Sequence, residues 1–326
     1  MPALLVERVL AGDPRAIARA ISVIEDESPQ SAGLVRAIFA HTGRAQLIGV
    51  TGPPGAGKST LVDRLAALFR RAGSTVGVLA VDPTSPYSGG AVLGDRLRMQ
   101  SHAGDEGVFI RSMATRGHLG GLSRATADAA LVLDAAGKDI VIIETVGVGQ
   151  DEVEIVRMAD VSIVTLAPGA GDEVQALKAG IMEIADIFVL NKADREGADR
   201  LASAIETNLS LRTYREDEWR PPIVQTVATS GQGVPQLVEA ISAFRAHAER
   251  DGGPARASSR DVRRRGRADQ RLRELVSLRF VDRLERDVLA PGEWANIVGR
   301  VAAREIDPYA AADELLKRAL PHVLPG

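Results

Sequence analysis

The chain has 326 residues, of which 45% are hydrophobic and 25% charged, a composition typical of a globular protein with a sizeable core. A net charge of −3 gives no general attraction to nucleic acid, and the absence of cysteine excludes disulfides and thiolate metal sites. No apolar run approaches the roughly 20 residues that cross a bilayer, and the N-terminus lacks a signal-peptide layout, so we expect a cytoplasmic protein with no membrane partner.

Residues 1–44 are predicted to form a helical N-terminal extension. Asp13 is placed to cap a helix that begins at Pro14, and a second helical pattern covers residues 30–40. The apolar residues of the first helix recur at helical spacing: Ile17, Ile21 and Ile24.

Residues 45–250 alternate short β-rich runs with helical patterns. This alternation predicts an α/β fold with a mainly parallel sheet and helices on both faces. The expected strands are residues 47–51, 76–81, 140–143, 161–166, 187–190 and 223–227. Because functional groups of such a sheet gather beyond the carboxyl ends of its strands, the residues after each run are candidates for the site.

The segment 52–60, GPPGAGKST, follows the first strand and fits a phosphate-binding P-loop at every required position. Its main-chain N–H groups can turn toward a phosphate, and the N-terminus of the next helix adds a positive dipole end. Lys58 can reach the β- and γ-phosphates, and Ser59 can ligate Mg²⁺. A plain glycine-rich turn that caps a helix is the weaker alternative. The predicted nucleotide-binding residues here are Gly55, Ala56, Gly57, Lys58, Ser59 and Thr60.

Two aspartates follow the second strand. Asp82 comes directly after it, and Asp95 lies further along the same connection. Both could serve Mg²⁺ or position water. As isolated residues they would equally suit a turn, since Asp82 precedes a proline, and a helix N-cap, since Asp95 precedes a helical stretch.

Glu144 directly follows the third run, which is expected beside the P-loop strand, and an acidic residue at this place can hold Mg²⁺ through water. The N–H of Gly147 can contact the γ-phosphate, so the following loop would respond to hydrolysis. Most GTPases have Asp at the position of Glu144, and a water-orienting Gln where this chain has Val148. Gln150 lies nearby, but nothing in the sequence places it in line. We therefore expect slow intrinsic hydrolysis and a helper group from another loop or a partner.

The tetrapeptide Asn191-Lys192-Ala193-Asp194 follows the fifth strand and predicts guanine recognition. The Asp194 carboxylate can accept the ring N–H and the exocyclic amine of guanine, a donor pair that adenine lacks. The stem of Lys192 can lie along the base, and Asn191 can tie this loop to the P-loop. A site built on such hydrogen bonds rejects a partnerless analogue by on the order of 10⁴-fold. A polar helix cap is the alternative.

The C-terminal residues 260–326 are predicted to form a helical arm after a polar break at residues 251–259. A long amphipathic helix covers residues 272–288, and a final helix begins after Asp307-Pro308. The apolar stripe of the long helix suits dimerisation or packing back on the core. The basic cluster before it suits a solvated helix entry, ion pairs across an interface or a phosphate-rich partner: Arg260, Arg263, Arg264, Arg265 and Arg267.

Taken together, five segments resemble the MeaB/ArgK-type P-loop GTPases that chaperone methylmalonyl-CoA mutase. They are GPPGAGKST, VDPTSPYSGGAVLGDRLRM, ETVGVGQDE, PGAGDEVQALKAG and NKAD. The resemblance covers most of the chain and implies a GTPase core, a helical N-terminal extension and a homodimerising C-terminal arm. It further implies that GTP hydrolysis to GDP is coupled to loading and protection of an adenosylcobalamin-dependent acyl-CoA mutase.

The resemblance also assigns residues by position. It implies that Lys58, Asp82, Asp95 and Glu144 form the catalytic and Mg²⁺ network, with Ser59 as the direct metal ligand. The glycine-flanked segment 169–180, which by itself could be a plain connector, becomes a third switch toward the mutase, and the switch residues are Gly147, Gln150, Asp172, Gln175 and Lys178. In the last guanine loop, Val227 stands where Ser is common, so only a backbone contact from Ala228 is expected.

Other functions are less favoured. A nickel-inserting GTPase would need a Cys/His constellation, and a targeting GTPase would need a methionine-rich domain, whereas this chain has no cysteine and five methionines. The main alternative is a kinase-like ATPase associated with transport of lysine, arginine or ornithine. The guanine-reading tetrapeptide argues against ATP, and no element that would recognise a phosphoacceptor is apparent.

Overall fold

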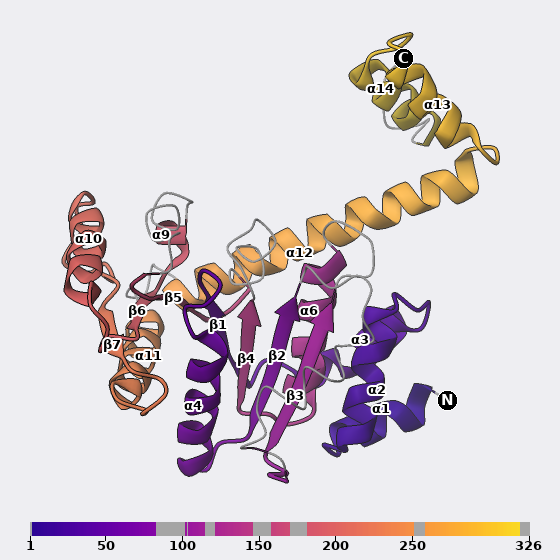
Figure 1. The fold of residues 1–326 in the computed structure, drawn as a ribbon. Helices are drawn as coiled ribbons and strands as arrows, with labels where there is room; N and C mark the ends of the chain where they lie inside the picture. Colours follow the sequence, from indigo (N-terminus) through magenta and orange to yellow (C-terminus); the bar gives the residue numbers. More distant parts are fainter. Residues whose placement is uncertain are drawn as a thin grey trace. The chain divides into compact units, whose positions relative to one another are not determined.

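The computed structural model describes residues 2–82, 102, 104–114, 121–145, 158–169, 181–250 and 258–319. The chain divides into two compact units, Met1–Arg260 and Asp261–Gly326, each with a hydrophobic core of its own (Figure 1).

The first unit is built on a seven-stranded sheet in the order β3-β2-β4-β1-β5-β6-β7, in which every described pairing is parallel. The predicted α/β fold is therefore confirmed. The strands are β1 (Gln46–Thr51), β2 (Val76–Asp82), β3 (Val108–Ala114), β4 (Ile140–Thr145), β5 (Val161–Leu166), β6 (Ile187–Asn191) and β7 (Ile223–Thr226).

Two features of the sheet differ from the sequence-based prediction. β3 was not expected, because Arg111 and Ser112 interrupt its apolar run. β4 is longer than predicted and includes Glu144, which pairs in register with Val50 of β1 instead of following the strand. The acidic candidate therefore lies inside the sheet, beside the end of the strand that leads into the P-loop.

Helices cover both faces of the sheet because alternate residues of its central strands point to opposite faces and both sets are apolar. One face packs against α4 (Lys58–Arg71) and α11 (Val234–Glu249). The other packs against α6 (Gly121–Ala135) and, toward β6, against α10 (Ala198–Ser210). The short helix α9 (Ile181–Ile184) precedes β6.

The N-terminal extension packs on the α6 face. Its elements are α1 (Pro2–Leu10), α2 (Pro14–Glu25), α3 (Ser31–Ile38) and the 3₁₀ turn η1 (Phe39–His41). As predicted, Asp13 caps α2, accepting the N–H groups of Arg15 and Ala16 at 2.9 and 3.0 Å. The predicted apolar stripe of α2 is buried against α6, β2 and β3.

Asp134, near the end of α6, fixes the chain where the extension enters β1. Its buried carboxylate, 4% exposed, accepts the backbone N–H groups of Gly43, Arg44 and Ala45 at 2.5, 3.2 and 3.0 Å. We expect Asp134→Ala to lower the free energy of unfolding by about 3 kcal/mol, because each hydrogen bond to a charged acceptor contributes about 1.5–3 kcal/mol and water replaces part of the loss. Urea denaturation followed by circular dichroism would measure this.

Two variants serve as controls for that measurement. Asp134→Asn keeps one acceptor oxygen and should fall between the wild type and the alanine variant. Asp217→Ala removes an exposed carboxylate that pairs with the equally exposed Arg215 and should change little. Equal stability of the two alanine variants would contradict an anchoring role for Asp134.

The second unit contains most of α12 (Ser259–Arg283), the π-helical turn η3 (Leu284–Val288), α13 (Glu293–Ala302) and α14 (Pro308–Ala319). The predicted long helix thus ends at Arg283, and α13 was not predicted. Part of the apolar stripe predicted for residues 272–288, including Leu284, lies in the core of this unit. Leu272 and Val276 of the same stripe are 62% and 58% exposed. Among the described residues, no helix is long and apolar enough to cross a membrane.

Candidate functional site

The loop between β1 and α4 has the backbone conformation that its glycines permit. Gly57 adopts φ +89° and Gly52 φ +141°. A Cβ on Gly57 would lie 2.4 Å from Nδ2 of Asn191, and one on Gly52 would lie 1.9 Å from the carbonyl oxygen of Thr165. Both positions therefore exclude a side chain, which allows the loop to lie directly against β5 and β6.

Lys58 begins α4 and points back across this loop. Its side chain is buried, and Nζ donates to the carbonyl oxygens of Gly52 and Pro53 at 2.7 and 3.0 Å. A phosphate bound by the loop would offer the ammonium group oxygens of full negative charge in place of neutral carbonyls. Lys58 thus lies across the loop, and its contact with the β- and γ-phosphates stays a prediction.

Ser59 and Glu144 meet at the edge of the same loop. Ser59 Oγ donates a hydrogen bond to Oε1 of Glu144. Glu144 is buried, with 2% of its surface exposed. In the adjacent strand ends, Oγ1 of Thr145 donates to Oγ1 of Thr51 at 2.9 Å, which ties β4 to the residue before the loop. Hydroxyl and carboxylate oxygens are the ligands that Mg²⁺ prefers, so this pair fits the predicted ion.

Asp82 and Asp95 are the two other residues predicted to serve the metal ion. Asp82 ends β2, where its backbone pairs with Ala114, but its side chain is not among those described. Asp95 lies outside the described residues. Within the described part of the chain, no group of three or more His, Asp or Glu side chains forms a metal site.

Asn191 joins the predicted base loop to the P-loop. It ends β6 and is 2% exposed, and its Nδ2 donates to the carbonyl oxygen of Ala56 at 2.8 Å. Its Oδ1 accepts two hydrogen bonds at 3.1 Å, from Oγ1 of Thr226 and from the N–H of Ala228. The Ala228 amide, expected to contact the base, is therefore engaged with Asn191 in this structure.

Lys192 and Asp194 lie at the open side of this loop. Lys192 has the left-handed φ of +57°, and its Nζ donates to the carbonyl oxygen of Gly55 at 2.7 Å, a second link to the P-loop. Asp194 is exposed, so its carboxylate is accessible to a ligand. The tetrapeptide and the phosphate loop thus form one continuous surface from segments far apart in sequence.

The structure adds one residue that sequence analysis missed. Arg64, on α4, donates to the carbonyl oxygens of Ala228 and Thr229. An arginine on the exposed face of a helix gives no signal in a single sequence, because such residues are usually solvated.

The predicted switch residues all lie outside the described residues: Gly147, Gln150, Asp172, Gln175 and Lys178.

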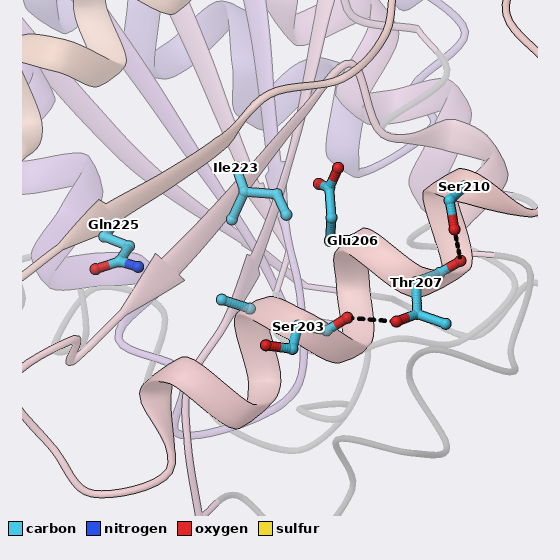
Figure 2. Close-up of a pocket in the computed structure, with 7 residues that line it drawn as sticks. Ser203, Glu206, Thr207, Ser210, Ile223 and Gln225 are labelled. Atoms are coloured by element: carbon cyan, nitrogen blue, oxygen red, sulfur yellow. Dashed lines mark hydrogen bonds between the residues drawn. The ribbon is translucent and has the colours of Figure 1, made fainter.

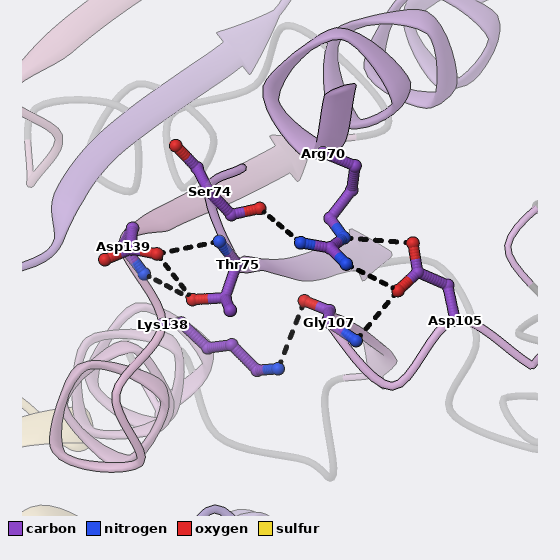
Figure 3. Close-up of polar contacts among 7 residues, drawn as sticks. All are labelled: Arg70, Ser74, Thr75, Asp105, Gly107, Lys138 and Asp139. Carbon is purple, nitrogen blue, oxygen red and sulfur yellow. Dashed lines mark hydrogen bonds and ion pairs between the residues drawn. The ribbon is translucent and has the colours of Figure 1, made fainter. Parts of the chain in front are cut away.

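A polar cluster at the opposite end of the sheet is structural. Arg70 forms an ion pair with Asp105 at 2.8 Å (Figure 3). The Arg70 hydrogen bond, helped by the Gly107 N–H, lowers the pKa of Asp105 to about 2. Lys138 donates to the Gly107 carbonyl at 3.2 Å, and burial lowers its pKa. These contacts tie the start of β3 and the turn before β4 to the end of α4.

An open groove of about 530 Å³ lies between α10 and β7, at one edge of the sheet (Figure 2). Three hydroxyls along α10 donate to carbonyl oxygens of the same helix, and Glu206 pairs with Arg220. The hydroxyls belong to Ser203, Thr207 and Ser210. Because these groups are satisfied within the protein, the P-loop surface is the better candidate for the functional site.

Comparisons with known proteins show which family the chain resembles along most of its length. The model of the family described as methylmalonyl Co-A mutase-associated GTPase MeaB matches residues 17–288. A relative from Pyrococcus abyssi is 50% identical over 320 residues, which cover 97% of this chain and 96% of the relative. GTPase ArgK of Escherichia coli is 40% identical over 247 residues, 74% of this chain and 75% of ArgK.

A solved structure extends the similarity to the whole fold. A crystal structure of a LAO/AO transport system kinase superposes with a TM-score of 0.70 and 28% sequence identity. The superposition covers 96% of each chain. Both helical ends of the chain therefore fall within the shared architecture.

Proposed function

This chain belongs to the family of methylmalonyl-CoA mutase-associated GTPases, and we propose that its GTP hydrolysis serves an adenosylcobalamin-dependent acyl-CoA mutase, foremost methylmalonyl-CoA mutase. In this role, turnover of GTP to GDP is coupled to loading and protection of the mutase cofactor. The observation that carries the proposal is the family match over residues 17–288, whose description names the mutase. The match includes the P-loop and the base loop.

Hydrolysis requires that the protein first bind the phosphates of GTP. We assign this to the main-chain amides of residues 55–60 and to Lys58, whose ammonium group now rests on carbonyl oxygens of the loop itself. On binding GTP it would exchange those carbonyls for β- and γ-phosphate oxygens, with little movement of a buried side chain. The gain is electrostatic, because a positive charge faces the oxygens on which negative charge is redistributed during phosphoryl transfer.

Mg²⁺ fits the oxygen pair beside the loop. Ser59 would be the direct ligand, and Glu144 would act on the ion through water, as the hydrogen bond between them supports. Asp82 and Asp95 are proposed as further members of this network. When bound there, Mg²⁺ would neutralise charge on the β- and γ-phosphate oxygens.

We propose that the Asn191–Asp194 loop selects guanine. Asp194 is exposed and can accept two hydrogen bonds from the base, while Asn191 and Lys192 tether the loop to the phosphate cradle. Because the two loops are linked, a nucleotide must satisfy both to be held. This loop distinguishes GTP from ATP and so favours the GTPase over the kinase-like alternative.

The sequence also supports dependence on a partner. Val148 stands where a water-orienting Gln is common, so the chain by itself offers no clear group to align the attacking water. We propose that the mutase completes or reorders the site through Gly147 and Gln150 and through a third switch that includes Asp172, Gln175 and Lys178. Residues of these segments lie outside the described part of the chain.

Binding of the mutase should therefore accelerate GTP hydrolysis. The expected increase is at least about tenfold, since correctly placing one proton-accepting or water-orienting group is worth about 10²–10⁴-fold. Phosphate release would be measured with and without a purified adenosylcobalamin-dependent mutase, and complex formation by size-exclusion chromatography. A mutase with a different cofactor serves as the control. If the adenosylcobalamin-dependent enzyme neither binds nor stimulates, the chaperone role is wrong even though the GTPase remains.

The alternative is a kinase-like ATPase associated with amino-acid transport, and the solved relative is called a LAO/AO transport system kinase. It requires ATP to bind at least as well as GTP and a phosphoacceptor to be modified. Competition between ATP and labelled GTP for binding distinguishes the GTPase from the kinase-like ATPase directly.

Oligomeric state and compartment complete the proposal. We propose residues 1–44 as the N-terminal extension, 45–250 as the GTPase domain and 260–326 as a homodimerisation arm. The exposed apolar residues Leu272 and Val276 of α12 support a partner for that arm. The protein would act in the cytoplasm, with no nucleic-acid partner.

A further inference from the structure

Arg64 connects the helix after the phosphate loop to the loop after β7. Its Nε donates to the carbonyl oxygen of Ala228 at 3.0 Å, and its Nη2 donates to that of Thr229 at 2.6 Å. Arg64 and Thr229 are exposed, whereas Ala228 is buried with 3% exposure. One planar guanidinium group therefore holds two successive carbonyl groups of a surface loop.

This contact closes a circuit of hydrogen bonds around the nucleotide-binding surface. The Ala228 N–H donates to Asn191 Oδ1 at 3.1 Å, and Asn191 Nδ2 donates to the carbonyl oxygen of Ala56 at 2.8 Å. Ala56 lies in the P-loop, immediately before the start of the helix that carries Arg64. The phosphate loop, the Asn191–Asp194 loop and the loop at Ala228 are thus held together in a ring.

The links in this ring differ in character. The two contacts of Asn191 are buried, and one of them lies against Gly57, where no side chain fits. The Nη2 contact of Arg64 is exposed. It is charge-assisted and comes from an exposed side chain, whereas the companion Nε contact to the Ala228 carbonyl is partly buried. The ring should therefore open at Arg64.

We propose that Arg64 is a positioning residue that holds the Ala228–Thr229 loop closed beside the guanine base and thereby sets the rate at which GDP leaves. The inference rests on the proposed function, because it requires the base to lie between this loop and the Asn191–Asp194 loop. Arg64 does not touch the reacting phosphate. Its effect reaches the nucleotide through Ala228 and Asn191.

The test compares Arg64→Ala with the wild-type full-length protein. Dissociation of a fluorescent GDP analogue would be followed after adding excess GDP. We expect release to be about tenfold faster in the variant, the effect of losing one exposed, charge-assisted anchor of the loop. The preference for GDP over ADP, measured by competition, should fall by a similar factor, because the loop acts on the base and not on the phosphates. Arg64→Lys keeps the charge but not the planar fork, so it should release GDP at an intermediate rate.

Arg71→Ala is the matched control, since it removes an exposed arginine from the C-terminal end of the same helix. It should release GDP at the wild-type rate. Wild-type release by Arg64→Ala would overturn the inference, and so would an equal weakening of GDP and ADP, which would indicate damage to the phosphate cradle. If the wild-type protein binds no GDP, the proposed function itself fails.

Discussion

Replacing Lys58 with alanine is expected to lower kcat for GTP hydrolysis by at least about 10²–10³-fold, since removal of one preorganised neutral donor from an oxyanion hole already costs that much. The structure gives the reason. The ammonium group is buried within the loop, and its hydrogen bonds go to two carbonyl oxygens that bound phosphate would replace. Alanine leaves the developing charge without this donor. Phosphate release under saturating GTP and Mg²⁺ would measure the loss.

Lys138 offers a matched control for that experiment. It is also a buried lysine whose Nζ donates to a carbonyl oxygen, but it lies before β4, at the end of the strand opposite Glu144. Lys138→Ala should reduce stability while leaving the catalytic rate of the folded protein near that of wild type. Hydrolysis at the wild-type rate by Lys58→Ala would remove the P-loop assignment, whatever the stability of either variant.

Asp194→Asn is expected to exchange the base preference of the protein from guanine to xanthine. The aspartate carboxylate presents two acceptors to the ring N–H and amine of guanine. An asparagine amide presents one acceptor and one donor, which matches the ring N–H and the carbonyl of xanthine. We expect a swing in the ratio of GTP to XTP affinity of at least about 10³-fold, because each mismatched pair leaves polar groups unsatisfied. Calorimetric titration of each protein with GTP and with XTP would measure both affinities.

Asp199→Asn is the control for this change. Asp199 is an exposed aspartate in the first turn of α10, close in sequence to the base loop. Its substitution should leave the base preference unaltered. If Asp194→Asn keeps the wild-type selectivity for GTP, the base is read elsewhere. The same result would require reassigning Asn191 and Lys192 as a purely structural tether between β6 and the P-loop.

Part of this site could be predicted because its chemistry is contiguous in the chain. GPPGAGKST contains both the glycines that shape the loop and the lysine predicted to contact the phosphate, so the prediction depends on local backbone geometry. The Asp13 cap and the helix that begins at Pro308 follow from equally local signals. β3 was missed because Arg111 and Ser112 interrupt its apolar run, and α13 was missed because its helical pattern extends over only 10 residues.

The amino-acid sequence by itself predicted a phosphate-binding loop at a strand–loop–helix turn, and its alternating β-rich and helical patterns determined a parallel sheet. Tertiary structure alone decided which distant groups meet there. Ser59 contacts Glu144 across 85 positions, and Arg64 reaches Ala228 across 164. These pairs depend on β1 lying between β4 and β5 and on which helix covers each face. Hydrophobic periodicity orients a strand's faces but carries no information about its neighbours, so only the folded packing could bring such residues together.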